Sequence, residues 1–200
     1  MSEQFTPLKP GALLAPVPAV MVSCARQGEK PNIITLAWVG TVNSEPPMCS
    51  ISVRKERYSH DIIQSSGEFI INLCGQDQLN ATDYCGVKSG RDEDKFAACG
   101  LTPLPVEGFT APAIAQCPVY LACRVKSIQE LGSHDLFLGE IERVGIRKEM
   151  MDEAGRIDYG RMKLFAYNHG NYYALGDALG FFGCSVASPD VYERRMKQLR

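Results

Sequence analysis

Apolar and polar residues alternate along two neighbouring segments, 32–38 and 48–54. A period of two with β-branched and aromatic residues is typical of half-buried strands. In the first segment the alternating sets are Asn32, Thr35, Ala37 and Val39 against Ile34, Leu36 and Trp38. In the second they are Cys49, Ile51 and Val53 against Ser50, Ser52 and Arg54. We expect a hairpin over 32–54 with its turn at 43–47. Its apolar face belongs to the core, and its small, hydroxylated, basic face suits a flat polar ligand with a phosphate.

The remaining periodicity predicts further short strands and helices. Strands are expected at 18–24, 68–73, 119–128, 136–146, 164–167 and 172–175, with a tight turn at 132–134. Short helices are expected at 59–66, 77–85 and 92–99, the first capped by Ser59 and stopped by Gly67. Residues 1–16 and 148–155 have no clear strand pattern, and 166–189 contain too many glycines for a regular helix. The pattern favours a mainly β fold, a closed or nearly closed barrel with peripheral helices, in a single domain over 1–200.

Composition narrows the possible partners. The chain has 200 residues, 45% of them hydrophobic, and a formal net charge of -2. Proteins that bind nucleic acids usually carry a clear basic excess, so we expect no nucleic-acid partner. The only basic stretch, 192–200, is interpreted as a solvated terminal helix. No run approaches the length of about 18 apolar residues that spans a bilayer, so no membrane partner is expected.

Eight cysteines are present, but none has the C-x-x-C spacing of a zinc or dithiol site. The chain shows no apolar signal segment after Met1, so we expect free thiols and a cytoplasmic location. The three histidines are far apart in sequence. A metal site is therefore not expected.

Three polar clusters offer chemistry, each with a simpler explanation. Arg54, Lys55, Ser59 and His60 surround a predicted helix start that attracts anions, although taken alone they fit a capped surface helix better. The segment 88–92, followed by Lys95 and Phe96, offers several donors beside Gly86 and Gly90, but polar glycine-containing segments usually only turn. Ser133-His134-Asp135 places a histidine at a strand end, where it is more often structural. No pattern supports nucleophilic catalysis.

The joint order of these motifs resembles the flavin reductase-like family, in particular its flavoredoxin branch. The resemblance covers approximately residues 15–185 and rests on several short motifs in sequence order. They are N-x-x-T-x-A-W-x-G at 32–40, P-x-x-S-x-S-V-R at 47–54, Y-S-H at 58–60, S-G-E-F at 66–69, N-L at 72–73, C-G-x-x-S-G-R-D at 85–92, D-K-F at 94–96, S-H-D at 133–135 and G-E-I at 139–141. The ordered set is much more specific than any one motif.

The resemblance implies an FMN-binding split β-barrel with short peripheral α-helices. It also implies a homodimer that holds FMN non-covalently near the subunit interface. The strand 32–38 would then lie along the isoalloxazine, Ser50–Arg54 along the ribityl chain, and basic and hydroxyl groups around the phosphate. The cofactor-binding residues implied are Asn32, Thr35, Leu36, Ala37, Trp38, Ser50, Ile51, Ser52, Val53, Arg54, Tyr58, Ser59, His60, Cys85, Gly86, Lys88, Ser89, Lys95 and Phe96, with His134 as the catalytic residue.

The resemblance leads to the hypothesis that the chain transfers electrons from NAD(P)H through FMN to a small-molecule or protein acceptor. Because no G-x-G-x-x-G motif is present, a nicotinamide would bind only transiently on the flavin. Two alternatives stay open. The chain could carry electrons between redox proteins without oxidising NAD(P)H, or it could be a non-catalytic module for a flat ligand. The clustered aromatics Tyr172, Tyr173, Phe181 and Phe182 predict a subunit interface.

Overall fold

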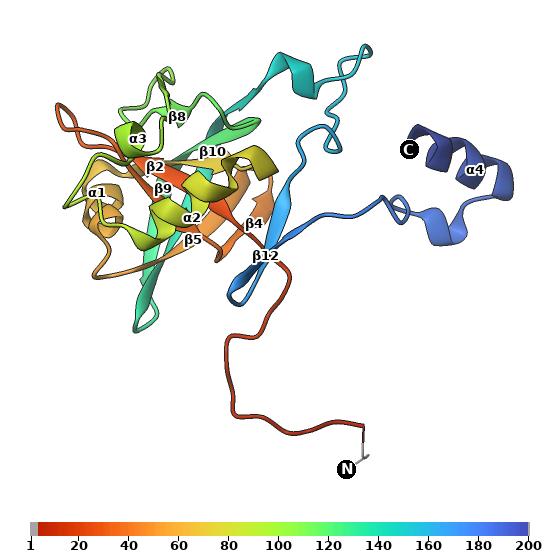
Figure 1. Cartoon of the computed structure of the whole chain (residues 1–200), viewed down its shortest axis with the longest axis horizontal. Coiled ribbons are helices and arrows are strands. Elements are labelled where there is room, and N and C mark those ends of the chain that lie inside the picture. The colour runs from red at the N-terminus through yellow and green to blue at the C-terminus, as the bar shows by residue number, and fades with distance from the viewer. Residues whose placement is uncertain (1–3, 200) are drawn as a thin grey trace.

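Seven antiparallel strands form the main sheet of the protein, which a computed structural model describes over residues 4–199 (Figure 1). The strand order is β3-β2-β6-β9-β10-β5-β4. The strands are β2 (Val20–Cys24), β3 (Asn32–Leu36), β4 (Val39–Ser44), β5 (Pro47–Arg54), β6 (Glu68–Leu73), β9 (Val119–Glu130) and β10 (His134–Ile146). The fold is therefore mainly β, and the long β9–β10 hairpin confirms the predicted pair of strands at 119–128 and 136–146.

The chain crosses from one end of this order to the other between β3 and β4. Only Ala37 and Trp38 separate these strands in sequence, yet they are the two terminal strands of the sheet. Such a short connection spans at most about 10 Å, so the sheet must curl until its ends approach. The Ser52 amide donates to the Trp38 carbonyl at 2.9 Å, which extends the β4–β5 pairing to the residue before β4. No ladder joins β3 to β4, so the hydrogen-bonded sheet is not closed.

The predicted hairpin over 32–54 is wrong in its first half. β3 pairs with β2, and the actual hairpin joins β4 to β5 through Glu45 and Pro46. A period of two indicates which side chains share a face, but it does not identify the neighbouring strand. The faces of β5 are confirmed, because Cys49, Ile51 and Val53 are buried and the intervening residues are not.

Large apolar side chains fill the inside of the curled sheet. Phe69 of β6 and Phe137 of β10 are fully buried there, among aliphatic residues from the other strands. Gly139 makes this packing possible, because a Cβ at that position would lie only 2.7 Å from Cζ of Phe69. Burying a phenylalanine contributes about 1.5–3 kcal/mol relative to leaving it exposed. The core therefore holds together strands that are distant in sequence.

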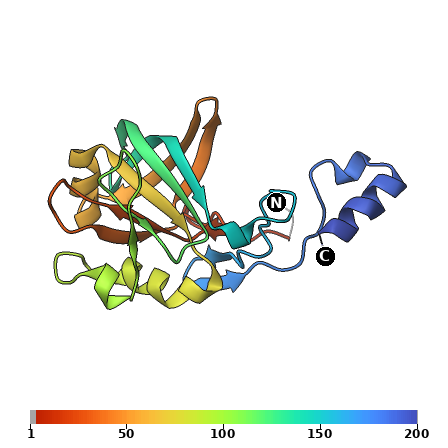
Figure 2. The same ribbon diagram turned by 90° about the horizontal axis from the view of Figure 1, so that it is seen from above.

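Three short helices pack against the sheet, two of them on its outside and one against the core inside it. They are α1 (Tyr58–Ser66), α2 (Leu79–Val87), which follows the 3-10 turn η1 (Gln76–Gln78), and α3 (Lys95–Ala98). Figure 2 shows α2 and α3, in yellow to yellow-green, along one side of the sheet. Gly67 ends α1 in the left-handed conformation at φ 69, as predicted. The predicted cap at Ser59 is wrong, because Arg57 is the N-cap and Ser59 lies buried inside the first turn.

The boundaries of the other two predicted helices also differ from the expectation. The helix expected at 92–99 is only α3, because the side chain of Asp94 caps it by accepting from the Ala97 amide. The helix expected at 77–85 begins as η1 and continues as α2 to Val87. The position of a helix cap depends on one backbone turn and one hydrogen bond. Where several polar residues follow one another, each of them can make that bond, so the sequence alone does not fix the first helical residue.

Smaller elements complete the chain. One sheet contains β1 (Val17–Pro18), β11 (Phe165–Asn168) and β12 (Asn171–Ala174), and another pairs β7 (Pro103–Leu104) with β8 (Ala113–Ile114). The 3-10 turns η2 (Lys148–Met150) and η3 (Cys184–Val186) precede and follow the β11–β12 hairpin, and α4 (Pro189–Gln198) ends the described chain. Residues 4–16 and 175–199 extend away from the sheet (Figure 1). All eight cysteines have free thiols. None of the helices in the described part of the chain is long and apolar enough to cross a membrane.

Candidate functional site: a cationic cavity

A cavity of about 440 Å³ opens where β3, the end of β5, the start of α1 and the segment before α3 meet. We call it the cationic cavity because five of its side chains are lysine or arginine and only one is a carboxylate. The residues that line it are Asn32, Ile34, Arg54, Glu56, Arg57, Tyr58, Ser59, Lys88, Ser89, Gly90, Arg91 and Lys95. Seven of the sequence-predicted site residues are among them.

The deep wall of the cationic cavity is polar and buried. Asn32 Nδ2 donates to Ser59 Oγ at 2.8 Å, which fixes both side chains. Lys95 Nζ donates to two backbone carbonyls, of Ile33 at 2.7 Å and of Cys85 at 2.9 Å. Burial lowers the pKa of Lys95 from its ordinary value. No carboxylate of the described residues pairs with this ammonium, so an anion in the cavity would supply its missing counter-charge.

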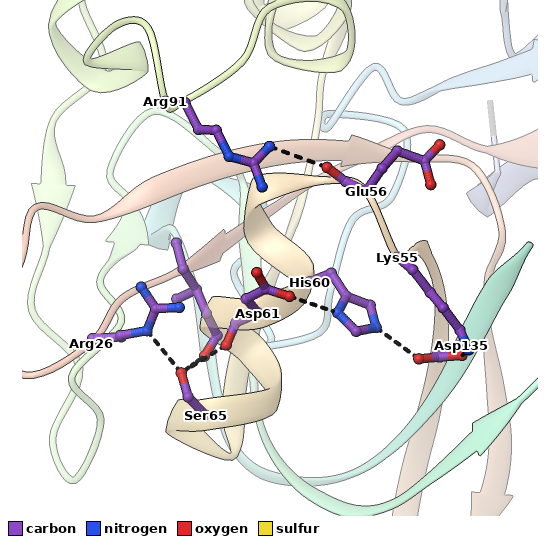
Figure 3. Close-up of polar contacts among 9 residues, drawn as sticks. Arg26, Lys55, Glu56, His60, Asp61, Ser65, Arg91 and Asp135 are labelled. Carbon is purple, nitrogen blue, oxygen red and sulfur yellow. Dashed lines mark hydrogen bonds and ion pairs between the residues drawn. The ribbon is translucent and has the colours of Figure 1, made fainter.

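The outer wall is the segment between α2 and α3, held against the start of α1. Arg57 donates to the Gly86 carbonyl at 3.0 Å, and Arg91 donates to the Glu56 carbonyl at 3.1 Å (Figure 3). Arg91 also stacks over the ring of Tyr58, with 5.3 Å from its guanidinium carbon to the ring centroid. These contacts keep the cations of the segment beside the amides of the first helical turn, where anions are favoured.

Gly90 has a steric function in this wall. A Cβ at position 90 would overlap the side-chain amide of Asn32, which is itself bonded to Ser59. A glycine at position 90 therefore lets the segment close over the deep wall. The close approach that Gly90 permits is to the Asn32 side chain.

An aromatic pair lies at the rim of the site. Trp38 and His134 have ring centroids 4.5 Å apart, and His134 lies opposite Arg54 in the β5–β10 ladder. Ser133 Oγ lies 2.9 Å from His134 Nδ1, which leaves Nε2 for another partner. Partial burial and then the charge of Arg54 lower the pKa of His134, so the imidazole is neutral at pH 7. Trp38 is 45% exposed. The pair therefore presents an open aromatic surface beside a cation.

His60 lies behind the cationic cavity and does not line it. Its Nε2 lies 2.8 Å from Asp135 Oδ2 and its Nδ1 lies 3.2 Å from Asp61 Oδ1 (Figure 3). Lys55 Nζ lies 3.4 Å from the other oxygen of Asp135. Burial raises the pKa of Asp135, but the His60 hydrogen bond and the Lys55 charge outweigh it and leave that pKa below its ordinary value. This buried network ties α1 to the start of β10.

The structure brings only part of the predicted site together. The predicted residues in the cationic cavity are Asn32, Arg54, Tyr58, Ser59, Lys88, Ser89 and Lys95. The others lie elsewhere. Leu36, Ile51 and Val53 are in the main core, Cys85 and Phe96 pack in a second apolar cluster, Ser50 and Ser52 are half-buried on β5, and Thr35, Ala37 and Gly86 line another cavity.

Two contributors were missed from the sequence. Arg57 precedes the helix directly, and a cation beside a helix start was an available signal for it. Asp135 was noted only as part of the Ser133-His134-Asp135 cluster, and its partner His60 is 75 residues away. No local spacing reveals such a pair.

Comparison with known proteins supplies a family context for this geometry. The family model described as "Flavin reductase like domain" matches residues 14–176. The flavoredoxin of Desulfovibrio vulgaris (Miyazaki F) superposes with a TM-score of 0.83 at 30% identity, covering 89% of this chain and 97% of that one. The flavoredoxin of Methanosarcina acetivorans superposes with a TM-score of 0.84 at 28% identity, covering 92% and 100%. An uncharacterized protein of Archaeoglobus fulgidus is 32% identical over 131 residues, which cover 66% of this chain and 74% of the relative.

Proposed function

The chain belongs to the flavin reductase-like family, and from this premise we propose that it is an FMN-binding redox protein. The observation that carries the proposal is the cationic cavity, where buried Lys95 has no carboxylate partner among the described residues and Arg54, Lys88 and Arg91 add positive charge. A dianionic phosphate would match this charge and the donors of the deep wall. A split β-barrel, as in the proposed family fold, fits the curled but unclosed sheet.

Specific groups of the chain would hold the parts of FMN. Arg54, Ser59, Lys88 and Lys95 would bind the phosphate, and the polar face of β5 would follow the ribityl chain. The backbone of β3 would contact the edge of the isoalloxazine. β3 is a terminal strand, and the Ile33 carbonyl points away from β2 toward Lys95. Every second residue of a strand directs its backbone groups to the same side, so the backbone N–H and C=O of Thr35 also point away from β2.

When bound, FMN would supply the electron chemistry, accepting two electrons and passing them on. The chain's own residues would orient and protect it. The Trp38–His134 pair would border the ring, and the neutral His134 would offer Nε2 for a hydrogen bond or a proton to the reacting ligand. In this proposal His134 is the catalytic residue, NAD(P)H is the transient donor, and a small molecule or a protein is the acceptor.

A second function within the same class is an electron carrier that does not oxidise NAD(P)H. The similarity to two flavoredoxins supports it as much as it supports a reductase. A non-catalytic module for another flat ligand has less support, because the cations expected for a flavin phosphate do gather in one cavity.

The purified protein tests these alternatives directly. We expect a yellow protein with about one FMN per chain, identified by acid release and chromatography, and no preferential retention of FAD. Anaerobic mixing with NADH or NADPH, followed by the flavin absorbance, separates a reductase from a carrier. A colourless protein that cannot be reconstituted with FMN overturns the flavin proposal itself.

We also propose a homodimer. The segment after β12 exposes Leu179 at 94% and Phe182 at 102% of their surfaces, and such apolar exposure is typical of an interface. Tyr172 does not contribute to this exposed set, because it packs on Tyr167 and bonds Asp83. Sedimentation should give a dimer at micromolar concentration, and a monomer there would contradict the proposal.

A further inference from the structure

Two cysteines bracket the segment that carries the outer wall of the cationic cavity. Cys85 lies in α2 and Cys99 directly follows α3, with 3.9 Å between their Sγ atoms. The chain between them, 86–98, includes Lys88, Arg91 and Lys95 of the cavity. A bond between the two sulfur atoms would therefore close the cation-bearing segment into a loop.

Hydrogen bonds already hold the two ends of this loop together while the cysteines are thiols. Lys95 Nζ donates to the Cys85 carbonyl at 2.9 Å, and the hydroxyl of Tyr84 donates to Glu93 Oε2 at 2.5 Å. The sulfur atoms of a disulfide are about 2.05 Å apart, so the pair must approach by about 2 Å. Cys99 can supply this movement, because α3 has only four residues and short helix ends shift easily. The cross-link is therefore compatible with the closed position of the segment.

Exposure distinguishes this pair from other close thiols. Cys99 is half-buried, whereas Cys85 behind it is fully buried. Cys49 and Cys123 are closer to each other, with 3.4 Å between their Sγ atoms, but both lie in the main core. A dissolved oxidant therefore reaches Cys99 first, and the core pair provides an internal comparison.

Both thiols of the pair are weak acids. Burial raises the pKa of Cys99 above its ordinary value, and burial raises the pKa of Cys85 to about 12. Each cysteine is thus protonated at pH 7, and its reaction depends on a small thiolate fraction. We expect slow oxidation under sustained exposure to an oxidant, unlike the fast reaction of an activated catalytic cysteine.

We propose that Cys85 and Cys99 form a reversible disulfide that locks the outer wall of the cationic cavity. The oxidant is a hydroperoxide. The Cys99 sulfur attacks its terminal oxygen, which gives a sulfenic acid and an alcohol, or water from hydrogen peroxide. The Cys85 sulfur then attacks the sulfenic sulfur and releases water. Two thiols thus lose two electrons and two protons, the peroxide O–O bond is broken, and a dithiol reductant reverses the change.

The disulfide should slow the opening of 86–98. A cross-link restricts the opened segment more than the closed one, so it favours the closed form. Amide exchange over 86–98 should therefore slow whether or not a ligand is bound. The effect on FMN rests on the proposed function, and there we expect the release of FMN to slow roughly tenfold.

Peptide mapping of the full-length protein tests the site. The protein is incubated with hydrogen peroxide, free thiols are alkylated in denaturant, and mass spectrometry locates cross-linked peptides before and after dithiothreitol. We expect a Cys85–Cys99 link that dithiothreitol removes, while Cys49 and Cys123 are recovered as alkylated thiols. Amide exchange over 86–98 and stopped-flow release of FMN are measured on the reduced and the oxidised protein.

Two alanine variants supply the controls. Cys99→Ala removes the accessible thiol, so it should abolish the link and its effect on exchange, while its FMN affinity matches that of the reduced wild type. Cys184→Ala removes the other half-buried cysteine and should retain the link. Absence of the link, a Cys99–Cys184 link between chains, or a link that leaves exchange unchanged would each overturn the inference. A protein that binds no FMN would contradict the proposed function instead, because the link and the exchange rates do not require FMN.

Discussion

Replacing Arg54 by alanine tests the phosphate site with the least damage to the fold. The Arg54 side chain is 53% exposed, and among residues 4–199 its only ion pair is with Glu56 at 3.4 Å. A hydrogen bond from a charged group contributes about 1.5–3 kcal/mol, and the exposure of Arg54 argues for the lower end. Arg54→Ala should therefore raise the FMN dissociation constant roughly tenfold. Riboflavin has no phosphate, so its affinity should barely change.

The apoprotein supplies the control for folding. Exposed ion pairs such as Arg54–Glu56 are worth under about 1 kcal/mol, so the melting temperature without ligand should hardly move. Arg143→Ala removes an exposed arginine from β10, away from the cationic cavity, and should leave both flavin affinities unchanged. Fluorescence titration of both flavins into all three proteins gives the comparison. Equal losses for FMN and riboflavin would refute the phosphate assignment of Arg54.

Three more changes probe the surroundings of the site. Trp38 is the chain's single tryptophan, and its emission should be quenched as FMN is added; unchanged emission at saturating FMN would place the ring away from it. The Cβ of Gly90→Ala should overlap Asn32, which should cost about 1–3 kcal/mol of stability and weaken FMN binding. Gly40→Ala is the control, because its Cβ meets open space; calorimetry and FMN titration should separate the two variants. Asp135→Asn should lower the melting temperature at pH 7. Folding lowers the pKa of Asp135, so the higher melting temperature of the wild type is present above pH 3.8, the ordinary pKa, and is lost as the pH falls through the folded pKa. A difference in melting temperature that stays constant down to pH 2 would contradict this.

Local sequence patterns correctly predicted the strands and helix ends that depend on neighbouring residues. The alternation of β5 identified its buried and open faces, and Gly67 marked the end of α1. The paired strands 119–128 and 136–146 followed from a turn between two alternating segments. In each case the residues that decide the structure are within a few positions of one another.

Strand pairing and long-range contacts could not be predicted in the same way. The pairing of β3 with β2, and not with β5, depends on the curling of the whole sheet. Lys95 owes its buried position to the carbonyls of Ile33 and Cys85, which come from two other elements. The two-residue strands β7 and β8 are too short to leave a period. Of the residues predicted to surround a phosphate, Arg54, Ser59 and Lys95 gather in the cationic cavity, whereas those predicted to contact a flavin ring lie in several places. Cations and helix starts are visible in sequence, and a strand's open edge is not.

The outer wall of the cationic cavity, together with Lys95 of its deep wall, comes from one continuous segment of the chain. β6 and β9 are neighbours in the sheet, so everything from 74 to 118, including α2, α3 and the segment that carries Lys88 and Arg91, is an excursion between adjacent strands. Such an excursion can open without separating any strands of the main sheet. We therefore expect its amides to exchange with solvent well before those of β6 and β9, and ligand entry and release to proceed by local opening. The excursion can also change in length or charge while the sheet stays intact, so ligand affinity and fold stability can vary separately.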